Sequence, residues 1–110
     1  KLGISAITLL LVSACGSNLS CSIPNATTPD TCTEFDEGYN TASASALCTA
    51  AGGSNYVYSS SATCIATNRV GGCQVTASSK TSITNYYSPT YSAATGQAAC
   101  TGQGGTWAAN

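Results

Sequence analysis

Apolar residues are distributed unevenly along the chain. Residues 2–12 form a nearly unbroken apolar run, whereas the remainder mixes small polar residues with single branched or aromatic ones. One lysine precedes the run and small residues follow it, which is the layout of an export signal. At about 1.5 Å per residue the run reaches about half of a ~30 Å hydrocarbon layer, so it is too short for a membrane-spanning helix. A buried core helix is the alternative interpretation.

Two segments in the second half alternate as strands do. Residues 69–77 and 82–88 place branched or aromatic residues between small polar ones, on either side of a polar turn. This pattern predicts a β-hairpin. Further strands are expected at residues 54–58 and around Trp107.

A shift of 52 residues superimposes part of the first half on the second. It aligns Cys48 with Cys100 and Tyr39 with Tyr91, and each of the two cysteines begins the pattern C-T-x-x-G-G-[ST]. Each half also carries three cysteines. Self-similarity on this scale indicates a duplicated supersecondary unit.

Each repeat predicts one short helix. Asn40 and Ser92 can accept hydrogen bonds from the first free amides of a helix, and Gly52 and Gly104 can adopt the left-handed conformation that ends one. Helices of about 11 residues are marginal in isolation, so both must be held by packing.

The expected fold is α+β, a small disulfide-stabilised, loop-rich domain made of two duplicated strand-helix-strand units. We divide the chain into a signal segment at residues 1–14, a tether at 15–20, repeat unit A at 21–63 and repeat unit B at 64–110.

The apolar run ends in Val12-Ser13-Ala14-Cys15. An aliphatic residue, two small residues and a cysteine in this position resemble the lipobox of bacterial lipoproteins. The resemblance implies that the Cys15 thiol receives a diacylglycerol, that the leader is cut before Cys15, and that the new amino terminus is acylated.

The number of cysteines agrees with lipidation at Cys15. The chain has seven, an awkward number for an exported protein whose thiols should pair. Setting Cys15 aside leaves an even six: Cys21, Cys32, Cys48, Cys64, Cys73 and Cys100. Large apolar residues are few, so three disulfides are expected to be a condition of folding.

Six cysteines allow 15 pairing patterns, and sequence alone does not select one. Three cysteines per unit require at least one bridge between units if all are paired. Symmetry favours Cys32 with Cys48, Cys73 with Cys100, and Cys21 with Cys64.

Charge and residue types exclude several classes of function. Three basic and four acidic residues give a net charge of −1. The sequence has no cluster of basic residues that would bind nucleic acid. All four acids fall within residues 30–37. A weak cation site is the alternative to a solvated loop there, and the missing spacing of a calcium loop favours the solvated loop.

An enzyme is not expected, and neither is a cofactor. The chain has no histidine to serve as the base for a serine or cysteine nucleophile. The acids on one short loop are poor candidates for a glycosidase pair, which needs fixed separations across a cleft. Zinc is not expected because C-x2-C spacing is missing and export favours disulfides.

Two further resemblances concern the region after the leader. Residues 64–73, 86–91 and 100–107 resemble repeats of uncharacterised cysteine-containing lipoproteins of Gram-negative bacteria, a group that implies no established chemistry. The C-x-x-x-G-G segment before Thr106 and Trp107 resembles the first helix of C-type lectin domains. The calcium signatures E-P-N and W-N-D of those lectins are missing.

These observations predict a non-enzymatic cell-envelope lipoprotein with a structural or adhesive role. Gly16 follows the acylated cysteine where an inner-membrane retention signal would have Asp, so the outer membrane is the expected location. One alternative is a glycan- or peptide-binding module with exposed aromatic residues: Tyr86, Tyr87, Tyr91 and Trp107. Another is a filament subunit that retains its hydrophobic N-terminus. Oligomeric state and ligand are left open.

Overall fold

The computed structural model describes residues 19–25, 27–36 and 38–110. The predicted signal segment and the lipidation site Cys15 lie outside these residues. The first half contains β1 (Leu19–Ile23), β2 (Thr31–Phe35), α2 (Thr41–Gly52), the 3-10 turn η1 (Gly53–Asn55) and β3 (Val57–Ser59). The second half contains β4 (Arg69–Ala77), β5 (Lys80–Tyr87), α3 (Ala93–Gly102) and β6 (Thr106–Ala109).

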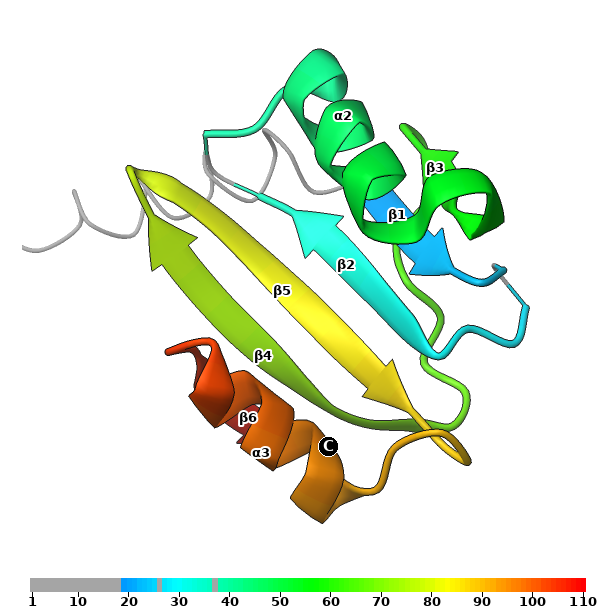
Figure 1. The fold of residues 1–110 in the computed structure, drawn as a ribbon, viewed down its shortest axis with the longest axis vertical. Coiled ribbons are helices and arrows are strands. Elements are labelled where there is room, and N and C mark those ends of the chain that lie inside the picture. Colours follow the sequence, from blue (N-terminus) through cyan, green and yellow to red (C-terminus); the bar gives the residue numbers. More distant parts are fainter. Residues whose placement is uncertain (1–18, 26, 37) are drawn as a thin grey trace, which may run out of the picture.

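The strands form one antiparallel sheet in the order β3-β1-β2-β5-β4-β6. Both helices lie on the same face, α2 over the β1 side and α3 over the β4 side (Figure 1). The expected small α+β fold is therefore confirmed. Two strands precede the helix in each half. In the second half they are the predicted hairpin, whereas in the first half β1 and β2 stand where the strand-helix-strand unit has one strand. β1 includes Leu19 and Ser20, which were assigned to the tether. No helix in the described part of the chain is long and apolar enough to cross a membrane.

The predicted helix starts are confirmed. The side chain of Asn40 accepts a hydrogen bond from the Ser43 amide at 2.9 Å, and the side chain of Ser92 accepts one from the Thr95 amide at 3.2 Å. In both caps the third helical residue bonds back to the capping residue, which satisfies a second free amide.

The helix ends were predicted less well. Gly104 has the expected left-handed backbone, with φ of +78°, but α3 has already ended at Gly102. At the end of α2 the left-handed residue is Gly53, with φ of +57°, and Gly52 keeps a right-handed backbone. The chain therefore turns one residue later than predicted, and η1 separates α2 from β3.

The predicted hairpin is strands β4 and β5. Its turn is tighter than expected, because only Ser78 and Ser79 separate the strands, and both have positive φ, 54° and 63°. Two positive φ angles in a two-residue loop match the right-handed twist of the strands.

The hydrophobic core is divided into two clusters, one beneath each helix. The first is centred on Cys21, Cys48, Phe35 and Ala44, and the second on Cys73, Cys100 and Tyr86. Each contains an aromatic pair in edge-to-face contact. Phe35 and Tyr39 have ring centroids 4.9 Å apart, and Tyr86 and Tyr91 have them 4.7 Å apart.

All six cysteines in the described residues form disulfides. The predicted bridge Cys73–Cys100 is confirmed, whereas the predicted pairs Cys32 with Cys48 and Cys21 with Cys64 are wrong. The bonds are Cys21–Cys48 and Cys32–Cys64 instead. Cys21 points to the helix-covered face, as Cys73 does. Cys32 in β2 is paired with Ser22, the residue after Cys21, so it points to the other face. Strand alternation therefore keeps Cys32 away from α2.

Candidate functional site

The helices cover one face of the sheet, and the candidate site lies on the opposite face. A linker, residues 60–68, connects β3 to β4 and contacts this face at several points. The Ser20 hydroxyl donates to the Ala62 carbonyl at 2.7 Å, and the Cys64 amide donates to the Glu34 carboxylate at 3.0 Å. The Cys32–Cys64 disulfide joins the linker covalently to β2. The linker therefore covers the part of the face formed by β1 and β2.

Tyr86 and Tyr87 are adjacent in β5, so their side chains point to opposite faces of the sheet. Tyr86 packs in the cluster beneath α3, and Tyr87 lies on the face opposite the helices. The Tyr87 hydroxyl donates a 2.7 Å hydrogen bond to the Ile65 carbonyl in the linker. Only 1% of Tyr87 is exposed. The alternative in which Tyr87 is one of the exposed aromatic residues of a binding module is therefore wrong for this residue, because the linker encloses it.

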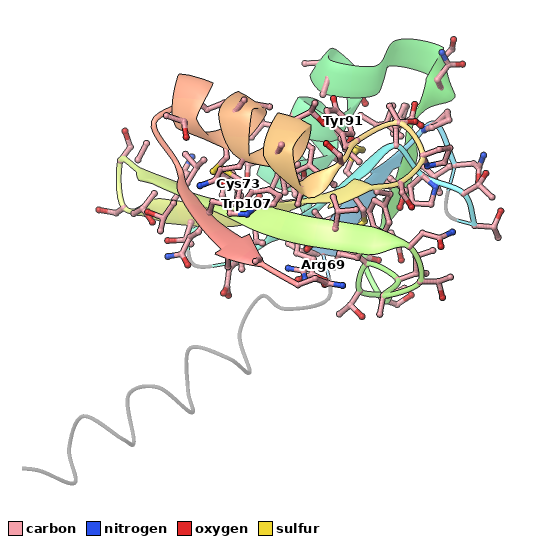
Figure 2. All side chains as sticks on the ribbon, turned by 90° about the horizontal axis from the view of Figure 1, so that it is seen from below. Arg69, Cys73, Tyr91 and Trp107 are labelled. Atoms are coloured by element: carbon pink, nitrogen blue, oxygen red, sulfur yellow. A yellow bond between two sulfur atoms is a disulfide. The ribbon has the colours of Figure 1, made fainter. Side chains whose placement is uncertain are left out.

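The other predicted binding residues belong to the core. The Tyr86 ring lies 5.9 Å from the Trp107 ring and packs edge-on against Tyr91. Figure 2 shows Trp107 close to Cys73, and Tyr91 farther along on the helix side of the sheet. Trp107 and Tyr91 are half-buried. The four aromatic residues therefore stabilise two faces of one sheet and do not form a common exposed platform.

Burial affects the ionisation of both tyrosines. It raises the pKa of Tyr86, and the hydrogen bond that the Gln103 side chain donates to the phenol oxygen at 2.9 Å opposes the increase. Burial, followed by the negative charge of Glu34, raises the pKa of Tyr87 to about 12, and Arg69 opposes this increase. Both phenols are neutral at ordinary pH and serve as hydrogen-bonding groups, not as bases.

A hollow opens on the helix-free face where the linker no longer covers it. It has a volume of about 160 Å³ and lies over β4, β5 and β6. We call it the Arg69 hollow and define it by the residues that line it: Arg69, Gly72, Gln74, Ile83, Thr106 and Ala108. Figure 2 shows Arg69 on the side of the sheet away from the helices.

Arg69 is held in this hollow by amide side chains. Its Nε donates to Asn85 at 2.6 Å, and its Nη1 donates to Asn110 at 2.5 Å. Asn85 is buried, and its own amide nitrogen donates to the Cys32 carbonyl at 3.2 Å.

Arg69 and Asn85 were not among the site residues predicted from the sequence. Strict alternation along residues 69–77 would put Arg69 on the same face as Cys73. The β-bulge between Arg69 and Gly71 moves it to the opposite face, beside Asn85, so alternation alone could not have found it.

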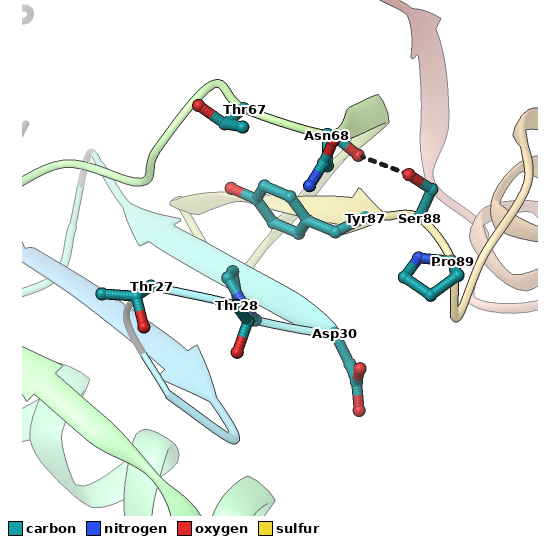
Figure 3. A pocket seen from close by; sticks show the side chains of 9 residues that line it. Thr27, Thr28, Asp30, Thr67, Asn68, Tyr87, Ser88 and Pro89 are labelled. Carbon is teal, nitrogen blue, oxygen red and sulfur yellow. Dashed lines mark hydrogen bonds between the residues drawn. The ribbon is translucent and has the colours of Figure 1, made fainter.

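A second, smaller hollow lies at the end of the sheet (Figure 3). Its volume is about 100 Å³, and it lies between the β1–β2 loop, the linker and the segment after β5. The Tyr87 ring forms part of its wall, and the Ser88 hydroxyl closes one side by donating to the Asn68 carbonyl. It has room for small polar groups or a few waters and is too confined for a ligand of ordinary size.

The acidic residues that the structure describes, Asp30, Glu34 and Asp36, do not gather into a cation site. The Glu34 carboxylate accepts from the Cys64 amide, and the Asp30 carboxylate accepts from the Thr90 hydroxyl at 2.5 Å. Among the residues that the structure describes, no group of three or more His, Cys, Asp or Glu residues could hold a metal ion.

Comparison of the chain with models of protein families, with curated proteins and with solved structures finds no match.

Proposed function

We propose that this chain is a non-enzymatic cell-envelope lipoprotein with a structural or adhesive role. Cys15 carries the lipid, and a folded domain stabilised by three disulfides projects from it. The observation that carries the proposal is the pairing of the six cysteines in the described residues, which leaves Cys15 as the one remaining cysteine of seven. Disulfides persist in oxidising compartments outside the cytosol, where lipid-anchored proteins of this kind are displayed.

The non-enzymatic part of the proposal is supported by how the polar groups are used. The chain has no histidine, two of its four acids accept hydrogen bonds from the fold, and the phenol groups of Tyr86 and Tyr87 are neutral at ordinary pH. A general base or nucleophile would need a residue outside this set. The proposed location is the outer membrane, on the strength of Gly16 after Cys15.

We also propose that the two halves descend from one duplicated hairpin-helix-strand unit. Cys21–Cys48 and Cys73–Cys100 each join the first strand of a half to its helix, with the same sequence separation of 27. The two halves share the capped helix start and the edge-to-face aromatic pair. Thr33 and Thr84 face each other where the halves meet, with hydroxyl oxygens 2.9 Å apart.

The lipoprotein proposal is tested with the Cys15→Ser variant in a bacterial host. The native protein is expected to enter the detergent phase of a phase split, because two or more acyl chains anchor stably. Cys15→Ser is expected to remain in the aqueous phase or as an uncut precursor. Ser17→Ala, two residues away, is the matched control and should behave as the native protein does. Partition of the native protein into the aqueous phase would contradict the proposal.

A further inference from the structure

The Arg69 hollow is not part of the helix-covered core, and the linker does not cover it. Over the first half of the sheet the equivalent face is covered by the linker through Ser20, Glu34 and Cys32. Over the second half the hollow remains open, with Gln74 and Thr106 exposed at its rim. The two halves therefore have similar structures on the helix-covered face, but on the opposite face the first half is covered by the linker and the second is open.

The charge of Arg69 is not neutralised within the described residues by a hydrogen-bonded acid. Both of its hydrogen bonds there go to neutral amide oxygens, those of Asn85 and Asn110. A guanidinium has five N–H donors, so three remain for a ligand. Asn85 is fixed by its bond to the Cys32 carbonyl, and it therefore fixes the orientation of the guanidinium plane.

Gly72 allows the guanidinium to lie against the sheet. A methyl group on Gly72 would come within 2.6 Å of the Arg69 Nη2 atom. The glycine thus leaves room for the flat group directly over the β4 backbone. The colliding atom is the end of a flexible side chain, so Gly72→Ala would move the guanidinium while leaving its charge and the strand in place.

The other residues that line the hollow determine which chemical groups a ligand can have beside its acidic group. Ile83 and Ala108 are apolar, and Gln74 and Thr106 offer hydrogen bonds at the rim. The volume of about 160 Å³ is below the roughly 300–1,000 Å³ of sites for drug-sized ligands. The hollow therefore fits a small acidic group with a short apolar substituent.

We propose that the Arg69 hollow binds the carboxylate of a small organic acid, with Arg69 as the principal ligand-binding residue. A guanidinium pairs with a carboxylate through two parallel N–H···O bonds, a geometry that lysine cannot reproduce. The same chemistry is offered by a free short-chain acid and by the C-terminal carboxylate of a peptide. The inference concerns the folded domain alone and is independent of lipidation at Cys15.

The proposal is tested by NMR titration of the oxidised domain with propionate, and with propionamide as its uncharged match. Propionate is expected to shift the Arg69 Nε–H signal and the Gly72 and Thr106 amides in a saturable way, with a dissociation constant in the millimolar range. Propionamide should leave them in place. N-acetyl-alanine and its amide form the second pair of probes. Tighter binding of N-acetyl-alanine than of propionate would identify a chain end as the source, and equal or weaker binding a free acid.

Three variants and one control make the result specific. Arg69→Gln should abolish the shifts, and Arg69→Lys and Gly72→Ala should each weaken binding by about tenfold or more, since a charged hydrogen bond is lost or misplaced. Lys80→Gln removes a cation from the start of β5, at the far end of the hairpin, and should bind as the native domain does. Amide signal dispersion reports that each variant is folded, and Gly72→Ala keeps the test available if Arg69→Gln unfolds. Equal responses to propionate and propionamide, or equal losses in Arg69→Gln and Lys80→Gln, would overturn the proposal.

Discussion

The hydroxyl of Tyr87 donates a 2.7 Å hydrogen bond to the backbone carbonyl of Ile65. This bond connects the end of β5 to a linker that precedes it by 22 residues, on the face that the helices leave free. Together with Cys32–Cys64 it holds the linker against the sheet. Tyr87 is consequently a core residue on the side where an exposed one was expected.

Tyr87→Phe is expected to lower the free energy of unfolding by about 1 kcal/mol, because the Ile65 carbonyl loses its partner. Tyr87→Ala should cost about 3–5 kcal/mol through the cavity it leaves. Tyr91→Phe is the matched control, since the Tyr91 hydroxyl makes no side-chain hydrogen bond among the described residues, and its stability should be nearly unchanged. Denaturant unfolding of the oxidised protein measures all three. A native-like midpoint for Tyr87→Ala would contradict burial of this ring.

Alkaline pH should destabilise the fold through the same residue. The pKa of Tyr87 is about 12 in the folded state against an ordinary value of 10.0, so the folded state holds its proton more tightly than the unfolded chain does. The resulting stability is complete below pH 10.0 and is lost as the pH rises toward about 12. Unfolding midpoints measured across this interval should fall more steeply in the native protein than in Tyr87→Phe. Parallel pH dependences would show that Tyr87 does not titrate in this way.

Two glycines of α3 are expected to respond to alanine in opposite directions. A methyl group on Gly96 would lie 2.8 Å from the Trp107 ring, whereas nothing lies within 4 Å of one on Gly102. Gly96→Ala should therefore cost about 1–3 kcal/mol by overpacking. Gly102→Ala should gain about 0.5–1 kcal/mol from helix propensity. Trp107 is the only tryptophan, so its fluorescence should change in Gly96→Ala alone. Stabilisation of both variants would argue against the packing of Trp107 beneath α3.

The two helix caps should contribute equally if the halves are equivalent units. Asn40→Ala and Ser92→Ala are each expected to cost about 1 kcal/mol, because each removes the acceptor for an amide in the first turn. Thr49→Ala serves as the control, since its exposed hydroxyl bonds only to the Ser45 carbonyl one turn earlier. Chemical denaturation of the three variants gives the comparison. A loss at one cap with none at the other would count against equivalent helix starts.

The sequence predicted local features well where one short-range signal decides them. The caps at Asn40 and Ser92 and the β4–β5 hairpin depend on neighbouring residues and were correct. Strand β1 carries the same kind of signal, since Leu19, Cys21 and Ile23 alternate with serines, but at five residues each neither β1 nor β2 was located from the sequence.

The pairing of cysteines required the register of the sheet, which the sequence does not display. Matching the cysteines by their order in each half put Cys21 opposite Cys64. The constant shift of 52 that aligns Cys48 with Cys100 also aligns Cys21 with Cys73, and these two hold equivalent bonds. The burial of Tyr87 depends on a linker far away in sequence, and the Arg69 hollow depends on where that linker ends. Neither the burial of Tyr87 nor the Arg69 hollow could therefore be predicted from a local sequence pattern.

Intact-mass measurement of the native protein, with and without reduction, tests the central claim most directly. We expect a chain that begins at Cys15, carries acyl groups, and gains six hydrogens on reduction because three disulfides open. A native protein that retains residues 2–12 would favour the filament-subunit alternative. A chain with an unmodified Cys15, or with Cys15 in a disulfide, would contradict the account.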